Sequence, residues 1–199
     1  MSACAQFSRA WEVHERILDA GQTPIIIDAG ANVGAASIWF SRQFPQAHIL
    51  AIEPDAENAD VCRLNTLDLP NIKVIEAAVG SEHGWVALIN SENQAWAVQT
   101  IRSKDGSIAV RTIPEFVLDE QQPAKIFLVK IDIEGFEDDL LANNADWVDG
   151  AEIIIIEPHD WLFPDKGTSR NFQKAIASRS FEILISGDSL IYFRLPTQT

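Results

Sequence analysis

Glycines and acids follow the first apolar run of the chain. The segment from Ile25 to Gly34 reads IIIDAGANVG, so Asp28, Gly30 and Gly34 come directly after three isoleucines. A buried strand that runs into a glycine-bearing turn and a helix is where α/β folds bind nucleotide-like ligands. A second apolar run, HILAI, ends in Glu53, whose carboxylate is placed to accept hydrogen bonds from ribose hydroxyls. Together these segments predict a site for an adenosine-containing cofactor.

The loop itself favours one kind of cofactor. Its pattern is DxGxNxG and not GxGxxG, and no GK[ST] follows, so neither a nicotinamide fingerprint nor a phosphate-binding P-loop is supported. Asp28 is expected to hold a methionine ammonium group directly or through water. The backbone of Gly30, Ala31 and Asn32 is expected to approach the ligand, because no bulky side chain stands in the way. The alternative is that Gly30 and Gly34 only permit a strand-to-helix turn.

The residues after the second and third strands are predicted to surround the adenosine. Glu53 takes the ribose hydroxyls, and Pro54 and Asp55 form the edge beside the adenine. Glu76 and the Ala77 amide, at the end of the third strand, are expected to read the polar edge of the base. A solvated acid that merely ends a strand is the alternative for Glu76.

A second set of ionisable residues lies in KIDIEG. Lys130, Asp132 and Glu134 are predicted at and beyond the end of the fourth strand, on one side if the strand continues that far, beside the reacting methyl group. Lys130 needs partners inside a sheet, with Asp132, Glu134 or Glu157 as candidates, and its role is structural or catalytic. Acids grouped at strand ends are candidates for perturbed pKa values, so Asp132 and Glu134 are predicted to be catalytic.

His159 follows the fifth strand and is the candidate base for a substrate hydroxyl, with Glu157 orienting it. A surface histidine on a polar loop is the alternative. Asp132, Glu134, Glu157 and His159 could instead hold a divalent ion, but their spacing does not demand one, and the metal-free route is the expectation. Trp96 is a candidate substrate contact, or merely packs its own segment.

Composition limits the partners and the location. The 199 residues carry a net charge of −14, which argues against a nucleic-acid partner, since each phosphate contact needs a cation. No apolar run is long enough to cross a bilayer, and residues 1–22 look like an amphipathic helix and not a secretory signal. Two cysteines cannot make a disulfide framework or a cysteine zinc site. A cytoplasmic location is therefore expected.

Strands and helices alternate along the chain, as a doubly wound α/β sheet requires. Three short segments of residues 84–112 alternate in polarity and predict a β insertion after strand 3. Residues 180–185 and 190–194, joined by SGDS, predict a terminal antiparallel hairpin. The expected strands are Pro24–Ala29, Ala47–Glu53, Ile72–Glu76, Lys125–Ile131 and Glu152–Glu157, and the expected helices cover about Val33–Phe44, Asp55–Leu67 and Ile113–Leu118.

These motifs resemble the FkbM-type methyltransferases. The resemblance rests on DAGANVG, AIEPD, EAAVGSEHG, TIPEF, LVKIDIEGFE and IIIEPH, and it spans about residues 24–194. It implies a Rossmann-like class I methyltransferase fold with a seven-stranded, mostly parallel sheet of order 3-2-1-4-5-7-6. It also implies S-adenosyl-L-methionine as methyl donor and O-methylation of a small molecule or sugar. The length of the chain predicts one domain over residues 1–199.

Two other functions fit some of the same residues. A binding protein that holds the donor without turnover would keep DAGANVG and Glu53. A nicotinamide-dependent oxidoreductase would also place an acid after the second strand. The acceptor depends on the shape of residues 84–112 and 159–170, which carry no recognisable substrate code.

Overall fold

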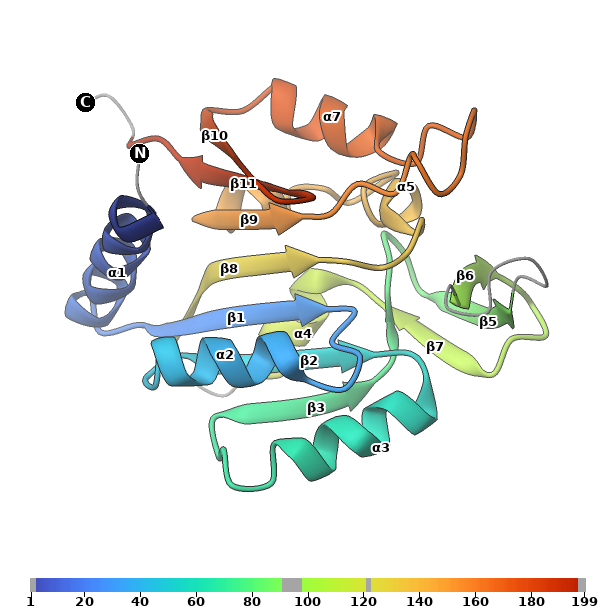
Figure 1. Ribbon diagram of the computed structural model, residues 1–199, viewed down its shortest axis with the longest axis horizontal. Helices are drawn as coiled ribbons and strands as arrows, with labels where there is room; N and C mark the ends of the chain where they lie inside the picture. Colours follow the sequence, from blue (N-terminus) through green and yellow to red (C-terminus); the bar gives the residue numbers. More distant parts are fainter. Residues whose placement is uncertain (1–2, 91–97, 121–122, 197–199) are drawn as a thin grey trace.

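A seven-stranded sheet forms the centre of the protein (Figure 1). The computed structural model describes residues 3–90, 98–120 and 123–196. The strand order is β10-β11-β9-β8-β1-β2-β3, in which only β11 pairs antiparallel, with β9 and β10. This confirms the predicted order and the terminal hairpin. The strands are β1 (Thr23–Ala29), β2 (His48–Glu53), β3 (Ile72–Glu76), β8 (Ala124–Ile131), β9 (Ile153–Ile156), β10 (Phe181–Ser186) and β11 (Ser189–Arg194).

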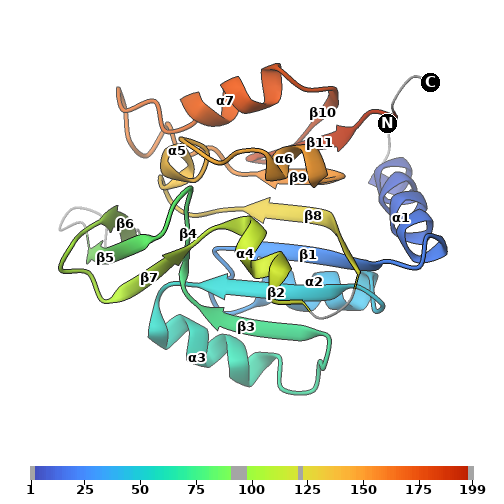
Figure 2. The ribbon, with the colours of Figure 1, turned by 180° about the vertical axis from the view of Figure 1, so that it is seen from behind.

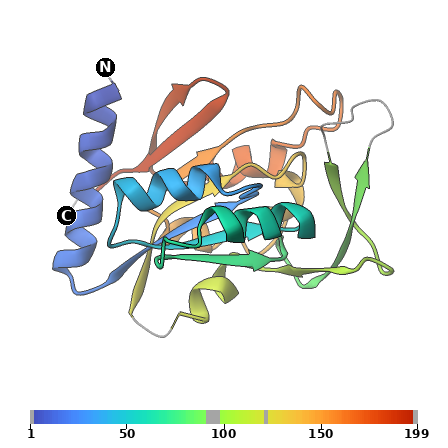
Figure 3. The ribbon, with the colours of Figure 1, turned by 60° about the horizontal axis from the view of Figure 1, so that its bottom comes forward.

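Both faces of the central strands are buried, which explains their continuous apolar runs. In β1, Ile25 and Ile27 belong to the core on one face and Ile26 to the core on the other. Helices α1 (Ala3–Asp19), α2 (Ala35–Gln43) and α3 (Ala56–Asn65) pack on the Ile26 face, where α2 and α3 lie side by side (Figure 3). Helices α4 (Ile113–Leu118), α6 (Trp147–Gly150) and α7 (Arg170–Ala177) cover the other face (Figure 2).

Capping side chains stabilise the first turns of two predicted helices. The Asp55 side chain accepts a hydrogen bond from the Asn58 amide at 2.9 Å and caps α3. Thr112 and Glu115 form a capping box at the start of α4. Helices α6, α7 and the short α5 (Glu137–Leu140) were not predicted from the sequence. These helices have four to eight residues, too few for a clear helical period.

A second, smaller sheet lies beyond the carboxyl ends of the parallel strands (Figures 1 and 3). Its order is β4-β7-β5-β6, from β4 (Ala78–Val79), β5 (Gly84–Asn90), β6 (Val98–Arg102) and β7 (Ile108–Arg111). The β insertion predicted for residues 84–112 is thus confirmed, and β4 joins it in parallel with β7. The Arg102 guanidinium binds both carboxylate oxygens of Asp139 in α5, at 2.8 and 2.7 Å, and ties this sheet to the main body.

The amino-terminal helix packs on the main sheet through Ala10 and Ile17. Within residues 3–90, 98–120 and 123–196, no helix combines the length and apolar character that crossing a bilayer requires.

Candidate functional site

Asp28 and Lys130 lie opposite each other on β1 and β8, near the carboxyl edge of the sheet. Asp28 is fully buried; it accepts a hydrogen bond from the Ser37 hydroxyl at 2.6 Å, and its other oxygen lies 3.2 Å from the Lys130 ammonium. Lys130 also lies 3.2 Å from Asp132 and donates to the Gly30 carbonyl. The predicted partner Asp132 is confirmed, and Asp28 is the partner that sequence reasoning missed.

Charge pairing sets the ionisation of Lys130. Burial lowers the pKa of its ammonium, but the negative charges of Asp28 and Asp132 outweigh burial and leave the pKa raised. Lys130 is therefore positively charged at neutral pH and forms ion pairs with two carboxylates.

The glycine loop brings two backbone segments unusually close together. Gly30 has a φ of +78°, and a Cβ placed on it would lie 1.8 Å from the backbone oxygen of Asp132. The amides of Gly30 and Ala31 both donate to the Ile52 carbonyl, so they are already hydrogen-bonded within the fold. Gly34, with a φ of +88°, ends the loop at the start of α2. The loop therefore joins the ends of β1, β2 and β8.

Glu53 is buried at the end of β2. Its carboxylate accepts hydrogen bonds from the Asn32 amide at 2.7 Å and the Asp55 amide at 3.0 Å. Burial raises the pKa of Glu53, and these two amide donors offset the increase only in part. Each carboxylate oxygen keeps a second lone pair, so Glu53 can still accept hydroxyl donors.

The residues predicted for the adenine edge separate into two groups. Pro54, Asp55 and Ala77 line a pocket at the carboxyl edge, although the Ala77 amide already donates to the Glu53 carbonyl at 3.2 Å. Glu76 is an exposed acid that lies 3.5 Å from Arg63 and outside the pocket lining. The position of Glu76 favours the alternative of a solvated acid.

The carboxyl-edge pocket is lined from both sheets. It has a volume of about 140 Å³, and Leu88 and Thr100, partners across β5 and β6, form its outer wall. The smaller sheet also contributes Ala78 and Val79 of β4. The rest of the lining is Gly30, Asn32, Ile52, Glu53, Pro54, Asp55, Asn58, Ala77, Asp132, Ile133, Glu134 and Phe136. The smaller sheet thus overhangs the predicted cofactor site. Trp96, the predicted substrate contact, falls outside the described residues.

Beside this pocket, His159 lies among three carboxylates. Its Nδ1 is 2.7 Å from an oxygen of the fully buried Glu137. Its Nε2 lies 3.7 Å from Asp132 and 3.8 Å from Glu157. Only 5% of the His159 side chain is exposed, so the alternative of a surface histidine is wrong.

The three acids determine how this cluster ionises. Burial lowers the pKa of His159, but the hydrogen bond to Glu137 and the charges of Glu137, Asp132 and Glu157 raise it more. Burial and the charge of Asp132 raise the pKa of Glu157. The cluster consequently favours a positive charge at its centre.

Glu134 takes a different position from the other acids. Strand β8 ends at Ile131, and Glu134 has a φ of +49°, so the strand does not continue to it. Glu134 lines the carboxyl-edge pocket, whereas Asp132, Glu157 and His159 offer ligand atoms within 4.8 Å of one another. Of the four predicted metal ligands, the structure therefore brings three together.

Glu137 is the functional candidate that sequence reasoning missed. It lies three residues after Glu134, on the first turn of α5, and its Oε1 also accepts the Gly135 amide at 3.2 Å. The sequence offered one signal, a third acid within LVKIDIEGFE. Its contact with His159 joins residues 22 positions apart and depends on the tertiary structure.

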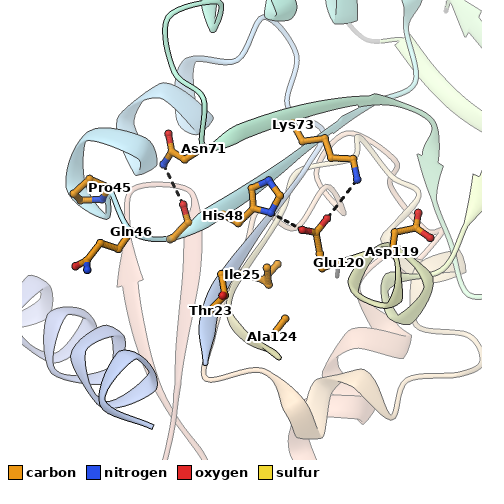
Figure 4. Close-up of a pocket in the computed structure, with 11 residues that line it drawn as sticks. Thr23, Ile25, Pro45, Gln46, His48, Asn71, Lys73, Asp119, Glu120 and Ala124 are labelled. Atoms are coloured by element: carbon orange, nitrogen blue, oxygen red, sulfur yellow. Dashed lines mark hydrogen bonds and ion pairs between the residues drawn. The ribbon is translucent and has the colours of Figure 1, made fainter. Parts of the chain in front are cut away.

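Another pocket lies at the opposite, amino edge of the sheet (Figure 4). It is larger, about 440 Å³, and its polar wall contains His48, which lies 2.5 Å from Glu120, and Lys73, 3.4 Å from the same acid. Size does not decide between the two pockets. Parallel α/β sheets bind ligands outside the carboxyl ends of their strands, where Glu53 and Asp132 lie. We therefore assign the candidate active site to the smaller pocket.

The fold and this site define a class I methyltransferase architecture. Residues 28–173 match the model of the "Methyltransferase FkbM domain", and the chain belongs to that family. The resemblance inferred from the motifs is confirmed.

The chain is similar to curated relatives and to a solved structure. It is similar to "Methyltransferase sdnD" of Sordaria araneosa, 32% identical over 59% of this chain and 47% of the relative. It is also similar to "2-O-methyltransferase NoeI" of Sinorhizobium fredii, 25% identical over 75% of this chain and 70% of the relative. The matched part is thus about half of the first relative's length. The bifunctional kinase-methyltransferase WbdD shares the fold, with a TM-score of 0.52 and 12% identity, over 98% of this chain and 40% of WbdD.

Proposed function

We propose that this protein transfers a methyl group from S-adenosyl-L-methionine to a hydroxyl oxygen of a small molecule or sugar. One observation carries the proposal. Asp132 lines the carboxyl-edge pocket, and its carboxylate also lies 3.7 Å from His159 in the neighbouring cluster. A donor held in the pocket therefore meets a cluster that can bind a hydroxyl and take up its proton. The family match and the name of the NoeI relative support a methyltransferase that acts on oxygen.

The pocket residues fit the donor's adenosine. Glu53 presents spare acceptor lone pairs to the ribose hydroxyls, and Pro54, Asp55 and Ala77 lie beside the adenine. The volume of about 140 Å³ is below the roughly 300 Å³ at which ligand pockets begin. The pocket therefore has to widen when the donor enters.

The methionine end of the donor is placed near Asp132. Asp28 is fully buried and engaged by Ser37 and Lys130, so we assign it an indirect role, in which its charge holds Lys130. Asp132 and Glu134, which line the pocket, are the acids that can face the donor's ammonium group or the acceptor. Lys130 is a positioning residue, because its three contacts all lie within the protein.

The chemistry requires alignment and removal of one proton. S-adenosyl-L-methionine supplies an electrophilic methyl carbon on a sulfonium sulfur. As the new carbon–oxygen bond forms, the carbon–sulfur bond breaks, its electron pair stays on sulfur, and the hydroxyl proton passes to the cluster or to water. Asp132, Glu157 and His159 orient that hydroxyl, and the cluster accepts its proton as negative charge develops on the oxygen.

Label transfer tests the proposal. The purified chain is incubated with methyl-labelled donor and a panel of sugars and small alcohols, and S-adenosylhomocysteine and labelled product are measured by mass spectrometry. We expect donor-dependent product with at least one acceptor. Tight S-adenosylhomocysteine binding without product from any acceptor or cell extract would favour a non-catalytic binding protein. Binding of NADH without binding of S-adenosylhomocysteine would favour an oxidoreductase.

The composition supports a location for this activity. The free, buried Cys62 suits a reducing compartment. We propose that the protein works in the cytoplasm, with a small-molecule or sugar acceptor and without a nucleic-acid partner.

A further inference from the structure

The geometry points to a divalent-cation site formed by Asp132, Glu157 and His159. This inference rests on the proposed function and replaces the metal-free route expected from the sequence. Asp132 follows β8 and Glu157 follows β9, and the Glu157 amide donates to the Ile131 carbonyl at 3.0 Å. The two acids are thus fixed beside each other at the ends of adjacent strands. The three side chains offer one nitrogen and two carboxylate oxygens within 4.8 Å of one another.

His159 supplies the observation that points to a ligand. Only 5% of its side chain is exposed. Its Nδ1 is hydrogen-bonded to the Glu137 carboxylate at 2.7 Å. Nε2 points toward Asp132 at 3.7 Å and Glu157 at 3.8 Å, distances too long for hydrogen bonds. A ring nitrogen of a nearly buried side chain thus faces two acids without a hydrogen bond to either.

Glu137 gives His159 the arrangement found at metal centres. A histidine that binds a metal through one ring nitrogen usually donates its other N–H to a carboxylate, which sets the tautomer and the ring orientation. Glu137 is fully buried and is held by the Gly135 amide, so it can fix the Nδ1–H tautomer. Nε2 then carries the lone pair that a cation needs.

The charges around the site are unbalanced without a cation. Asp28, Asp132, Glu137 and Glu157 are linked through ion pairs to Lys130 and to His159. Lys130 and a protonated His159 together supply two positive charges, which leaves two of the four carboxylate charges without compensation. A divalent ion between Asp132 and Glu157 offsets the excess where it is greatest.

The ligand set suits a cation that accepts both oxygen and nitrogen donors, such as Mn²⁺. Bond lengths of about 2.1 to 2.2 Å place adjacent ligand atoms about 3.0 to 3.6 Å apart. The Nε2 separations of 3.7 and 3.8 Å, and the Asp132–Glu157 separation of at most 4.8 Å, would shorten as the ion binds. Three protein ligands leave coordination positions for the acceptor hydroxyl and water. Coordination lowers the pKa of that hydroxyl, so a buried general base is no longer required.

Calorimetry with Mn²⁺ alone tests the site without using activity. The intact chain is stripped with EDTA, dialysed and titrated with MnCl₂. We expect one saturable site. We expect Asp132→Asn and Glu157→Gln to weaken it at least about tenfold, and Glu137→Gln to weaken it about 10- to 100-fold. Glu12→Gln, an exposed acid on α1, is the matched control and should bind as the wild type.

Pulsed electron paramagnetic resonance of the bound Mn²⁺ gives a second readout. We expect coupling to an imidazole nitrogen in the wild type and its loss in His159→Gln, with folding of each variant checked by circular dichroism. Absence of a saturable site, equal Mn²⁺ affinity in Glu157→Gln, or a bound ion without nitrogen coupling would each overturn the site.

The metal site and the methyltransferase activity can fail separately. Mn²⁺ binding without any S-adenosylhomocysteine binding or label transfer would remove the proposed function and keep the cation site. Label transfer that is unchanged by EDTA and unaffected by added Mn²⁺ would keep the function and remove the cation from it.

Discussion

The Lys130 ammonium and the Asp28 carboxylate face each other across β8 and β1 at 3.2 Å, directly beneath the candidate active site. Because Asp28 has no exposed surface, its charge depends on this partner and on the Ser37 hydroxyl. The pair connects the stability of the sheet to the position of Asp132, which shares the same ammonium.

Lys130→Met keeps most of the side-chain volume but leaves Asp28 buried without its cation. We expect a loss of about 3 to 5 kcal/mol in the free energy of unfolding, measured by urea denaturation. The control is Lys125→Met on the same strand, whose partly exposed pair with Glu152 at 3.3 Å should contribute less than about 1 kcal/mol. Equal losses in the two variants would show that the Asp28 pair is not a buried charge pair of this kind.

Gly30→Ala tests the close approach of two backbone segments. Gly30 and Gly21 both have a positive φ, +78° and +70°, so alanine introduces similar backbone strain at each position. Only at Gly30 does the new Cβ collide, at 1.8 Å from the Asp132 oxygen, while nothing lies within 4 Å at Gly21. We expect Gly21→Ala to reduce stability by about 1 to 2 kcal/mol and Gly30→Ala by clearly more. Matching melting temperatures would contradict the close approach.

Glu53→Ala removes the proposed acceptor of the ribose hydroxyls. Calorimetry with S-adenosylhomocysteine should show a loss of roughly 1 to 3 kcal/mol, because the hydroxyls lose a charged partner in a buried site. Glu57→Ala, an exposed acid on the first turn of α3, should leave the affinity unchanged. Circular dichroism checks the fold, since Glu53 also holds the Asn32 and Asp55 amides. Unchanged affinity in folded Glu53→Ala would remove the ribose assignment.

Cys62 should be unreactive in the folded protein. Burial, aided by the charges of Asp28 and Glu53, raises the pKa of its thiol to about 11. At pH 8 only roughly one thousandth of the thiol is then ionised, and the thiolate is the reactive form. We expect iodoacetamide to label Cys62 at pH 8 only after urea is added, with peptide mapping to distinguish it from Cys4.

The raised pKa of the Cys62 thiol also predicts that the stability of the protein depends on pH. Because the folded pKa exceeds the unfolded value, the contribution of Cys62 is complete below about pH 9 and is lost as the pH rises through 11. The melting temperature should therefore fall less between pH 9 and 11 in Cys62→Ala than in the wild type. Rapid labelling of Cys62 without urea would contradict both expectations.

The sequence determined the main sheet and the cofactor side of the candidate site. The consecutive isoleucines of β1 and β9 predict strands buried on both faces. Gly30 and Glu53 are identified by their places at the ends of two such strands. These signals are local, since each depends on residue types within one strand and the turn that follows it.

The tertiary structure decided the ion pair of Asp28 with Lys130 and the surroundings of His159. Asp28 and Lys130 are 102 positions apart, and Glu137 reaches His159 from another element. No spacing along the chain predicts these contacts, because strand order and the return of the loop after β9 bring them together. The ionisation of His159 depends on them in turn, since burial and neighbouring charges exist only after the chain has folded.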